Sequence, residues 1–447
     1  MINYVIVGNG AAGVTAAEAI RARDPRGHIT IVSGEPFPMY SRPGLAYVVI
    51  NEVSDTQVMA RREAWYGEQR IALVYGRAVK LDLEARRVVL DDGRAPAFDR
   101  LLIATGARAT PPPNPGAALD GVVYLDTLAG TRDLLRRART ARRAVVIGGG
   151  ITALELAEGL GHQGIETHYF IRKRGLWSAV FNEVESRLLE ARMRGHGIHL
   201  HFNTEIEAVL PDGQGRVRGV RLKTGEEFHC DLVGAAIGVK PQLELAKDTP
   251  LKVDRALLVD EYLQTNVPGV YAAGDCAQVY DRWTGQHLLD VLWPTAVAAG
   301  RAAGLNMAGA RQPYVKGTPF NACLLFGLHV TAIGQLGNGR GDDAEMFQTM
   351  SRGSSEVWAT RPHAYASAWS QDGTNTLRLV LDGDRLTGAL VVGRQTLADP
   401  LRALIETQAD VSALRPYLQA GGPALEQAVL RLVHKQPAFA EPVGRPL

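Results

Sequence analysis

The chain has 447 residues, of which 46% are hydrophobic and 21% are charged. At about 150 residues per domain, this length predicts roughly three domains with substantial cores, and the composition excludes disorder over most of the chain. The 49 Lys and Arg residues nearly balance the 47 Asp and Glu residues, so the formal net charge is only +2. That balance gives no support to nucleic-acid binding through a basic face.

The cysteine, histidine and hydropathy patterns argue against several further classes of protein. Cys230, Cys276 and Cys323 lie far apart without C-x-x-C spacing, which argues against a zinc cluster, a disulfide framework and a thioredoxin-type pair. The eleven histidines show no metal spacing on a shared helix face, so no metal site is predicted. No uncharged apolar run approaches the ~18 residues of a membrane span, and a strand pattern starting at residue 2 leaves no room for a signal peptide. We therefore expect a cytoplasmic protein with no membrane partner.

The chain opens with a strand, a glycine turn and a helix. The apolar run 2–7 is of strand type, the turn covers 8–13, and an Ala-rich amphipathic helix reaches Arg23. A second strand, 28–32, follows and ends at the segment 33–35. This order is typical of a nucleotide-binding unit.

Further strand and hinge signals follow. Loose alternation of apolar residues over 70–90 predicts a small antiparallel piece, and 101–107 predicts a buried strand running into a glycine turn. The proline-rich segment 110–116 predicts a stiff hinge.

After that hinge the opening pattern repeats, with a strand at 144–147, a turn at 148–153, a helix at 154–163 and a strand at 167–171. The first glycines of the two turns are 148 − 8 = 140 residues apart, which indicates a duplicated nucleotide-binding domain rather than a solenoid repeat. A third glycine-bearing strand end lies at 269–275. Beyond Pro313 the character changes to strands, such as 377–381 and 386–392, and then to a helix-like tail from Leu401.

The two glycine turns are suited to pyrophosphate binding. A lone turn of this kind is weak evidence, but each copy lies between a strand and a helix, where backbone N–H groups and the helix N-terminus favour a negative charge. Glu35 follows Gly13 by 22 residues at the end of the second strand, where a carboxylate accepts hydrogen bonds from a ribose diol. The alternative is that Glu35 is an ordinary loop acid.

With these motifs the chain resembles, over roughly residues 2–308, the FAD-dependent pyridine nucleotide reductases of the pyridine nucleotide-disulfide oxidoreductase superfamily. The resemblance implies an α/β fold with two Rossmann-like dinucleotide-binding domains and a smaller α+β C-terminal domain. The implied FAD domain is discontinuous, 1–115 and 240–312, with an NAD(P) domain inserted at 116–239. The segment 313–447 looks like the interface or acceptor domain of rubredoxin reductases and of the flavin module of NAD(P)H nitrite reductases.

Residue by residue, the resemblance implies cofactor contacts along both halves. Contacts with FAD are implied for Gly8, Gly10, Ala12, Gly13, Glu35, Arg42, Val79, Ala104, Thr105, Gly106, Arg108, Gly274, Asp275, Pro294 and Thr295. Contacts with the nicotinamide nucleotide are implied for Gly148, Gly150, Thr152, Arg172, Lys173, Arg174 and Gly238. The helix that begins near Trp293 would point its N-terminus at the flavin, although a core role for that tryptophan is equally expected.

The nucleotide preference is predicted from the strand end after the second turn. Where NAD-selective proteins carry an acid, this chain carries Arg172, Lys173 and Arg174. Guanidinium groups pair with a 2′-phosphate, so NADPH is the preferred cofactor and NADH the alternative. A solvated basic turn is the competing interpretation. Glu155 matches a family glutamate beside the nicotinamide ring, with a helix-surface acid as its competing interpretation.

The segment 40–47 carries no thiol, and Pro43 occupies the place of the redox cysteine found in other branches. Disulfide and peroxide reduction therefore lack a nucleophile. The Tyr-x-Arg-Pro pattern resembles the non-thiol branch, in which the arginine, here Arg42, approaches the FAD pyrophosphate. Tyr47 occupies the position of a lysine near the flavin, so the residues expected at the reacting centre are Pro43, Tyr47 and Glu155. Cys276 is expected to be a buried, inert cysteine.

These features predict an FAD-dependent NAD(P)H:acceptor oxidoreductase. Its flavin would receive hydride from NADPH and pass electrons directly to a small redox protein such as rubredoxin or ferredoxin. The alternatives are an NAD(P)H oxidase or quinone reductase, and a flavin-binding redox sensor. A homodimer is one assembly compatible with the resemblance.

Overall fold

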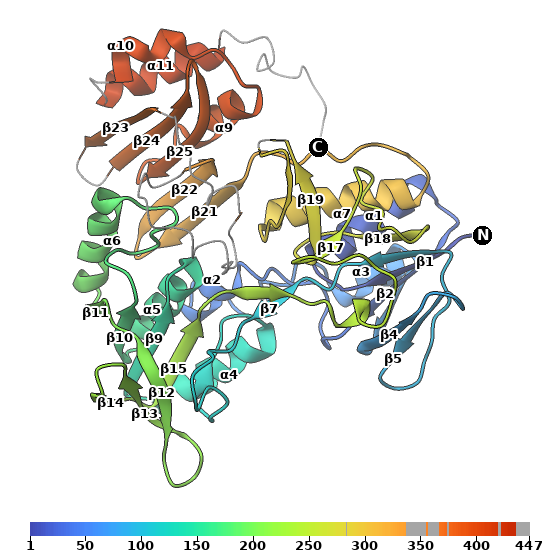
Figure 1. Cartoon of the computed structure of the whole chain (residues 1–447), viewed down its shortest axis with the longest axis horizontal. Helices are drawn as coiled ribbons and strands as arrows, with labels where there is room; N and C mark the ends of the chain where they lie inside the picture. The colour runs from blue at the N-terminus through green and yellow to red at the C-terminus, as the bar shows by residue number, and fades with distance from the viewer. Residues whose placement is uncertain (283, 337–354, 356–365, 373–374, 419–421, 435–447) are drawn as a thin grey trace.

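The computed structural model describes the chain except for residues 283, 337–354, 356–365, 373–374, 419–421 and 435–447 (Figure 1). Two five-stranded parallel sheets and one five-stranded antiparallel sheet, with helices packed on them, make up most of the described chain. This arrangement confirms the predicted α/β class. Among the described helices, none is long and apolar enough to cross a bilayer.

The first parallel sheet has the strand order β18-β6-β1-β2-β3. Its strands are β1 (Asn3–Val7), β2 (His28–Ser33), β3 (Ile71–Tyr75), β6 (Arg100–Ile103) and β18 (Val270–Ala272). The helix α1 (Ala11–Arg23) joins β1 to β2, as the sequence predicts. Tyr4 to Val7 are all buried, because both faces of a parallel sheet are covered and its strands carry continuous apolar runs.

The expectation that 70–90 is an antiparallel piece is wrong for its first half. The strand β3 pairs in parallel with β2, from Ile29 opposite Ile71 to Ser33 opposite Tyr75. Only β4 (Ala78–Asp82) and β5 (Arg87–Leu90) form the antiparallel pair. The reason lies in the sequence IALVY of β3, which is a continuous apolar run of the kind that a parallel sheet requires.

The second parallel sheet has the order β11-β10-β9-β15-β8. Its strands are β8 (Val122–Val123), β9 (Arg143–Gly148), β10 (Glu166–Ile171), β11 (His199–Phe202) and β15 (Leu232–Ala236). Its helices are α4 (Leu128–Ala138), α5 (Ile151–His162) and α6 (Glu183–Gly195). The helix predicted to begin at 154 begins instead at Ile151, because Gly150 is its N-cap and the residues after it are already helical. A small antiparallel sheet beside it contains β12 (Ile206–Pro211), β13 (Val217–Leu222) and β14 (Glu227–His229).

The chain leaves the first sheet after β6 and returns to it at β18, so the second sheet is inserted between two neighbouring strands of the first. The two crossings pair with each other as β7 (Ala107–Ala109) and β16 (Val239–Pro241). The helix α7 (Trp293–Met307) then packs against α1. A Cβ at Gly300 would lie 2.2 Å from the carbonyl oxygen of Ala12, so the two helix backbones touch there, which holds the start of α7 close to the first glycine turn.

The C-terminal sheet has the order β21-β22-β25-β24-β23. Its strands are β21 (Phe320–Leu325), β22 (Leu328–Gly334), β23 (Ala366–Asp372), β24 (Asn375–Asp382) and β25 (Arg385–Val392). Its helices are α9 (Ala398–Glu406), α10 (Arg415–Leu418) and α11 (Gly422–His434). The predicted strands 377–381 and 386–392 are therefore confirmed, as is the helical tail up to His434 in its described residues; 419–421 and 435–447 lie outside the described residues. Figure 1 shows this sheet (orange to red) beside the second parallel sheet, with which it shares a hydrophobic core through Leu325, Phe326 and α5.

The remaining described elements are short. They are α2 (Leu45–Val49), α3 (Glu63–Glu68), β17 (Leu257–Leu258), β19 (Ala277–Asp281), β20 (Gln286–Leu288) and the single 3-10 turns Glu244–Ala246 and Ser412–Leu414. The segment that contains α2 packs against both α4 and α5. It therefore carries the motif 40–47 from the first sheet to the second.

Candidate active site

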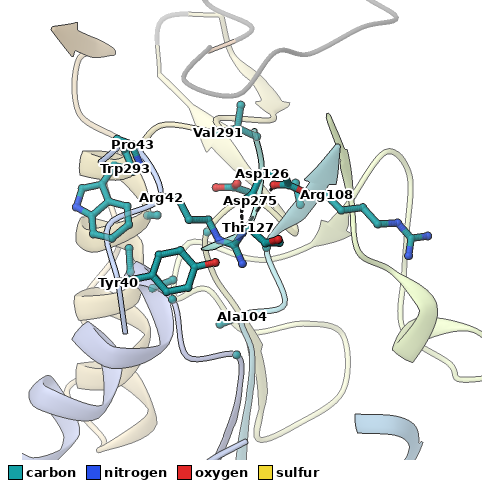
Figure 2. Close-up of a pocket in the computed structure, with 18 of the residues that line it drawn as sticks. Tyr40, Arg42, Pro43, Ala104, Arg108, Asp126, Thr127, Asp275, Val291 and Trp293 are labelled. Atoms are coloured by element: carbon teal, nitrogen blue, oxygen red, sulfur yellow. Dashed lines mark hydrogen bonds and ion pairs between the residues drawn. The ribbon is translucent and has the colours of Figure 1, made fainter. Parts of the chain in front are cut away.

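A cavity of about 650 Å³ lies where the two parallel sheets and the C-terminal sheet meet. Its walls include the first glycine turn and the ends of β2, β6 and β18 from the first sheet, and the start of α5 from the second. The strand β21 closes a further side. Figure 2 shows this cavity, with Arg42 extending toward Asp126 and Thr127 and Arg108 pointing away from them. Three parts of the chain that are distant in sequence thus contribute to one space.

The first glycine turn is built to approach a ligand closely. Gly8 has φ +121°, and a Cβ there would lie 2.0 Å from the carbonyl oxygen of Ala104, so glycine is required. Gly10 is the N-cap of α1, and open space surrounds its Cβ position to 4 Å among the described residues. The helix N-terminus therefore opens onto the cavity with its backbone N–H groups, which fits a pyrophosphate.

A hydrogen-bonded cluster surrounds the acid at the end of β2. The Tyr40 hydroxyl donates a 2.7 Å hydrogen bond to Oε2 of Glu35, and Arg42 forms an ion pair with Oε1. Arg42 also donates to the backbone carbonyl of Asp126, which lies beyond the hinge. Burial raises the pKa of Tyr40 well above its ordinary value, so its hydroxyl stays protonated and keeps donating to Glu35. The cluster holds Glu35 and Arg42 together on the cavity wall.

The second glycine turn reaches the cavity through the helix that follows it. Ile151, Thr152 and Glu155 of α5 line the cavity. The buried Tyr169 of β10 donates a 3.0 Å hydrogen bond to the carbonyl of Gly148, which braces the turn. The N-cap Gly150 leaves the start of α5 with backbone donors, as at α1, so this turn also fits a pyrophosphate.

The basic residues 172–174 follow β10 directly, and Arg172 and Arg174 are exposed. In the parallel pairing, Phe170 lies opposite Ile147, so the ends of β10 and β9 lie at the same edge of the sheet. The basic segment therefore lies beside the glycine turn that follows β9. This is the edge at which dinucleotides bind in sheets of this kind.

The C-terminal sheet supplies a wall that sequence reasoning missed. Phe320, Asn321, Ala322 and Cys323 of β21 line the cavity. These residues are more than three hundred positions from the first glycine turn (320 − 13 = 307), and their pattern signals only a strand, so no sequence signal marks them. Sequence reasoning also passed over Asp126 and Thr127 beyond the hinge, and Gln242 after β16, all of which line the cavity.

A thiol therefore lies on the cavity wall although the segment 40–47 has none. Burial and the carboxylates of Glu155 and Glu158 raise the pKa of Cys323 well above its ordinary value. Burial, Cys323 and Glu155 likewise raise the pKa of Tyr47. Cys323 and Glu155 thus both act on Tyr47, and Glu155 also acts on Cys323. The raised pKa keeps the cysteine in its thiol form.

A second cavity, of about 420 Å³, lies on the far side of this wall and shares Tyr47, Phe320, Ala322 and Cys323 with the first. It continues to the exposed residues His329 and Asp399 of the C-terminal region. The wall formed by β21 is therefore thin, and its outer side faces the surface.

The predicted site residues divide between the cavity and its surroundings. Those that line the cavity are Gly8, Gly10, Ala12, Glu35, Arg42, Pro43, Tyr47, Ala104, Thr105, Gly106, Arg108, Thr152, Glu155, Gly274, Asp275 and Pro294. Those outside its lining in the described chain are Gly13, Val79, Gly148, Gly150, Arg172, Lys173, Arg174, Gly238 and Thr295. Val79 is 52% exposed, because alternate residues of β4 face opposite sides and Ala78 takes the cavity side.

Two further expectations concern the region around α7. Trp293 and Pro294 begin α7 and line the cavity, so this helix N-terminus points into it. Thr295 instead donates a 3.2 Å hydrogen bond to Asp290. Cys276 is fully buried with its thiol 3.3 Å from the carbonyl of Ile103, which confirms its expected burial.

Comparison with known proteins gives the family. The family model described as pyridine nucleotide-disulphide oxidoreductase matches residues 2–302. The chain is 36% identical over 278 residues to rhodocoxin reductase from Rhodococcus erythropolis. The matched segment covers 62% of this chain and 65% of that protein. It is 29% identical over 436 residues to the NAD(P)H nitrite reductase of Bacillus subtilis, which is 95% of this chain and 50% of that protein. The chain thus spans about half to two thirds of the length of these relatives.

A solved structure agrees with the fold. The ferredoxin reductase of Rhodopseudomonas palustris superposes with a TM-score of 0.83 at 24% identity, covering 96% of this chain and 100% of that one. The chain belongs to the pyridine nucleotide-disulphide oxidoreductase family, whose members are FAD- and NAD(P)H-dependent oxidoreductases.

Proposed function

We propose that the protein is an FAD-dependent NAD(P)H:acceptor oxidoreductase that prefers NADPH and passes electrons to a small redox protein. The observation that carries this proposal is the single cavity into which both dinucleotide turns lead. One turn enters it through Gly10 and the start of α1, and the other through Thr152 and Glu155 of α5. Two dinucleotides held by these turns would meet end to end, as hydride transfer between them requires.

The first turn and its neighbours would hold FAD. The N–H groups at the start of α1 suit its pyrophosphate, Glu35 at the end of β2 suits its ribose, and Asp275 lies at the end of β18 on the same wall. Bound FAD would accept a hydride and release electrons singly or in pairs. The N-terminus of α7, directed into the cavity at Trp293, would favour negative charge on the reduced flavin ring.

Two features support NADPH as the donor, and a third supports a nicotinamide nucleotide of either kind. Arg172 and Arg174 are exposed beside the second glycine turn, where each can form forked hydrogen bonds with a 2′-phosphate. An acid at this position would repel that phosphate, and the chain has none at 172–174. Glu155 faces the cavity, where it would lie beside a bound nicotinamide.

The thin wall formed by β21 supports a protein acceptor. In the described part of the chain, Tyr47, Phe320, Ala322 and Cys323 border both the first cavity, which would hold the flavin, and the outward-facing second cavity. The names of the rhodocoxin reductase and the ferredoxin reductase describe proteins that reduce small carriers. We infer that a carrier of this class docks against the C-terminal sheet.

The test is a two-step experiment under anaerobic conditions. The FAD-loaded protein is first mixed with NADPH, and complete bleaching of the flavin within seconds is expected; reduction over minutes would favour a sensor. The reduced protein is then mixed with rubredoxin, ferredoxin, a quinone or air-saturated buffer, and reoxidation is followed by stopped flow. Reoxidation by air as fast as by either carrier would contradict the protein acceptor and favour an oxidase.

A further inference from the structure

A group of metal-ligating side chains lies on the second parallel sheet, away from the cavity. It consists of Glu166 and His168 on β10 and His199 and His201 on the edge strand β11. The parallel register sets His168 directly opposite His199 and Phe170 opposite His201. Because residues two apart on a strand point to the same face, all four side chains share one face of the sheet. Sequence spacing alone hides this group, since His168 lies 199 − 168 = 31 positions before His199 and 33 before His201.

The contacts within the group are close. Nδ1 of His168 is hydrogen-bonded to Nε2 of His201 at 2.9 Å. Nε2 of His168 is hydrogen-bonded to Oε1 of Glu166 at 3.0 Å. The rings of His168 and His199 are stacked with centroids 4.5 Å apart. One ligand atom from each of Glu166, His168 and His199 can be chosen so that all three lie within 4.8 Å of one another. We propose that Glu166, His168 and His199 bind one divalent transition-metal ion of the zinc class, with His201 as a positioning residue.

The geometry needs only small side-chain movements. Zinc bonds of about 2.0 to 2.1 Å to nitrogen place tetrahedral ligand atoms roughly 3.3 Å apart. The His168–Glu166 pair is already at 3.0 Å, and the ion would take the place of the proton shared between these two atoms. His199 is exposed at the edge strand, so its ring can turn inward without disturbing a packed core. Water would complete the coordination.

A hydrogen bond to a residue outside the ligand set would orient the central histidine. With the ion on Nε2 of His168, the Nδ1–H would donate to His201, which fixes the tautomer and ring orientation.

One neighbour opposes the ion. Arg143 of β9 holds the other oxygen of Glu166 at 2.9 Å, and its charge lowers the affinity for a cation. This hydrogen bond is made to Oε2, however, so Oε1 can still bind the metal. It also orients the carboxylate, as hydrogen-bond partners of the ligands do in zinc sites. The borderline-soft set of two imidazoles and one carboxylate favours zinc over calcium or magnesium, which prefer oxygen ligands.

The test is a zinc titration of the full chain as purified, stripped of metal with a chelator and carrying no histidine tag. Zinc sulfate competes between the protein and a chromophoric chelator at pH 7.5. One zinc ion per chain is expected, with His199→Ala and Glu166→Gln each weakening binding at least tenfold and His201→Phe weakening it 10- to 100-fold. His28→Ala, which removes an exposed strand histidine of the other parallel sheet, is the matched control and should leave the affinity unchanged.

Two further readouts separate ligation from folding. Circular dichroism of His199→Ala should match the parent, because the residue is exposed, and cobalt bound to the parent should give visible ligand-field bands that this variant lacks. Binding of zinc with equal affinity by the parent and His199→Ala would overturn the proposal. Loss of binding in His28→Ala, or no zinc bound by the parent, would overturn it as well.

Discussion

Glu158 of α5 accepts a 2.6 Å hydrogen bond from the backbone N–H of Phe326, in the turn between β21 and β22. This bond ties the helix that follows the second glycine turn to the strand that closes the cavity. Phe326 is 1% exposed and belongs to the core that both sheets share. The position of the cavity wall therefore depends on a carboxyl group held in a largely apolar junction.

That carboxyl group predicts a pH dependence of stability. Burial raises the pKa of Glu158 to about 7, Glu52 acts in the same direction, and the Phe326 hydrogen bond and His196 act against it. Between pH ~4.3 and this value the folded chain holds a proton that the unfolded chain has lost, so the group's contribution to stability falls as pH rises through this range and is constant above it. The whole effect is at most about 4 kcal/mol, and less where solvent screens the side chain.

Glu158→Gln keeps an acceptor for the Phe326 N–H and removes the titration. We expect urea unfolding between pH 5 and 8 to show a smaller decline in free energy for this variant than for the parent. Glu84→Gln, at an exposed position in the turn between β4 and β5, is the control and should follow the parent. Parallel pH profiles of the parent and Glu158→Gln would contradict the prediction.

Glu35 should determine how firmly FAD is retained. Its carboxylate is the ribose acceptor proposed above, and Glu35→Ala would also remove the acceptor of the Tyr40 hydroxyl and one of the two partners of Arg42, which keeps its bond to Asp126. We expect FAD to bind more weakly by about 1 to 3 kcal/mol, or roughly 5- to 150-fold, as measured by the fluorescence of released flavin. Glu68→Ala, an exposed acid of the same region paired only on the surface with Arg62, should retain FAD normally. Equal retention by both variants would remove Glu35 from the FAD site.

Nucleotide preference should respond to the basic segment after β10. Replacing Arg172 and Arg174 together with glutamine should lower the ratio of kcat/KM for NADPH to that for NADH by about 10² to 10⁴, since each charge-assisted contact contributes roughly 1.5 to 3 kcal/mol. Kinetics with NADH should change little. The matched control replaces Arg216 and Arg218, exposed arginines of the neighbouring antiparallel sheet, and should leave the ratio unchanged. Equal kcat/KM for the two nucleotides in the parent would show that 172–174 only faces solvent.

The sequence predicts the parts of this molecule that local rules determine. The strand–turn–helix units at Gly8 and Gly148 follow from apolar periodicity and from glycine at positions where a Cβ has no room. What it misses depends on contacts between distant segments. Cys323 reaches the cavity only because the C-terminal sheet packs on α5, and His168 meets His199 only because β10 and β11 pair in parallel. Single-residue spacing carries no information on either event.

A buried charge cluster that α7 contacts through the Thr295–Asp290 hydrogen bond should matter for stability. Lys316 Nζ lies 3.2 Å from Oδ2 of Asp290 and 3.6 Å from Oδ2 of Asp281, with all three side chains at most 2% exposed. Burial raises the pKa of Asp290 to about 6, which the lysine opposes. Lys316→Met would leave buried carboxylates without their cation and should cost about 3 to 5 kcal/mol in the free energy of unfolding.

The control for this cluster is Lys252→Met, an exposed lysine whose replacement should change stability by less than about 0.5 kcal/mol. Adding Asp290→Asn to Lys316→Met removes one of the buried charges and should recover part of the loss. A loss below about 1 kcal/mol for Lys316→Met alone would show that the cluster is hydrated or neutral in solution.

Cys323 tests whether electrons pass through a thiol. It lines the cavity, but burial and the carboxylates of Glu155 and Glu158 raise its pKa well above its ordinary value, so it stays a thiol near pH 7 and is a poor nucleophile toward disulfides. We expect Cys323→Ser to keep kcat for carrier reduction within about twofold of the parent and neither protein to turn over a disulfide. Cys230→Ser, at a buried position of the second sheet region, reports the packing cost of the same exchange. A tenfold loss of kcat confined to Cys323→Ser would contradict this expectation, as would disulfide turnover by the parent that this variant lacks. Either result would show that Cys323 acts as the redox cysteine whose place Pro43 occupies in the segment 40–47.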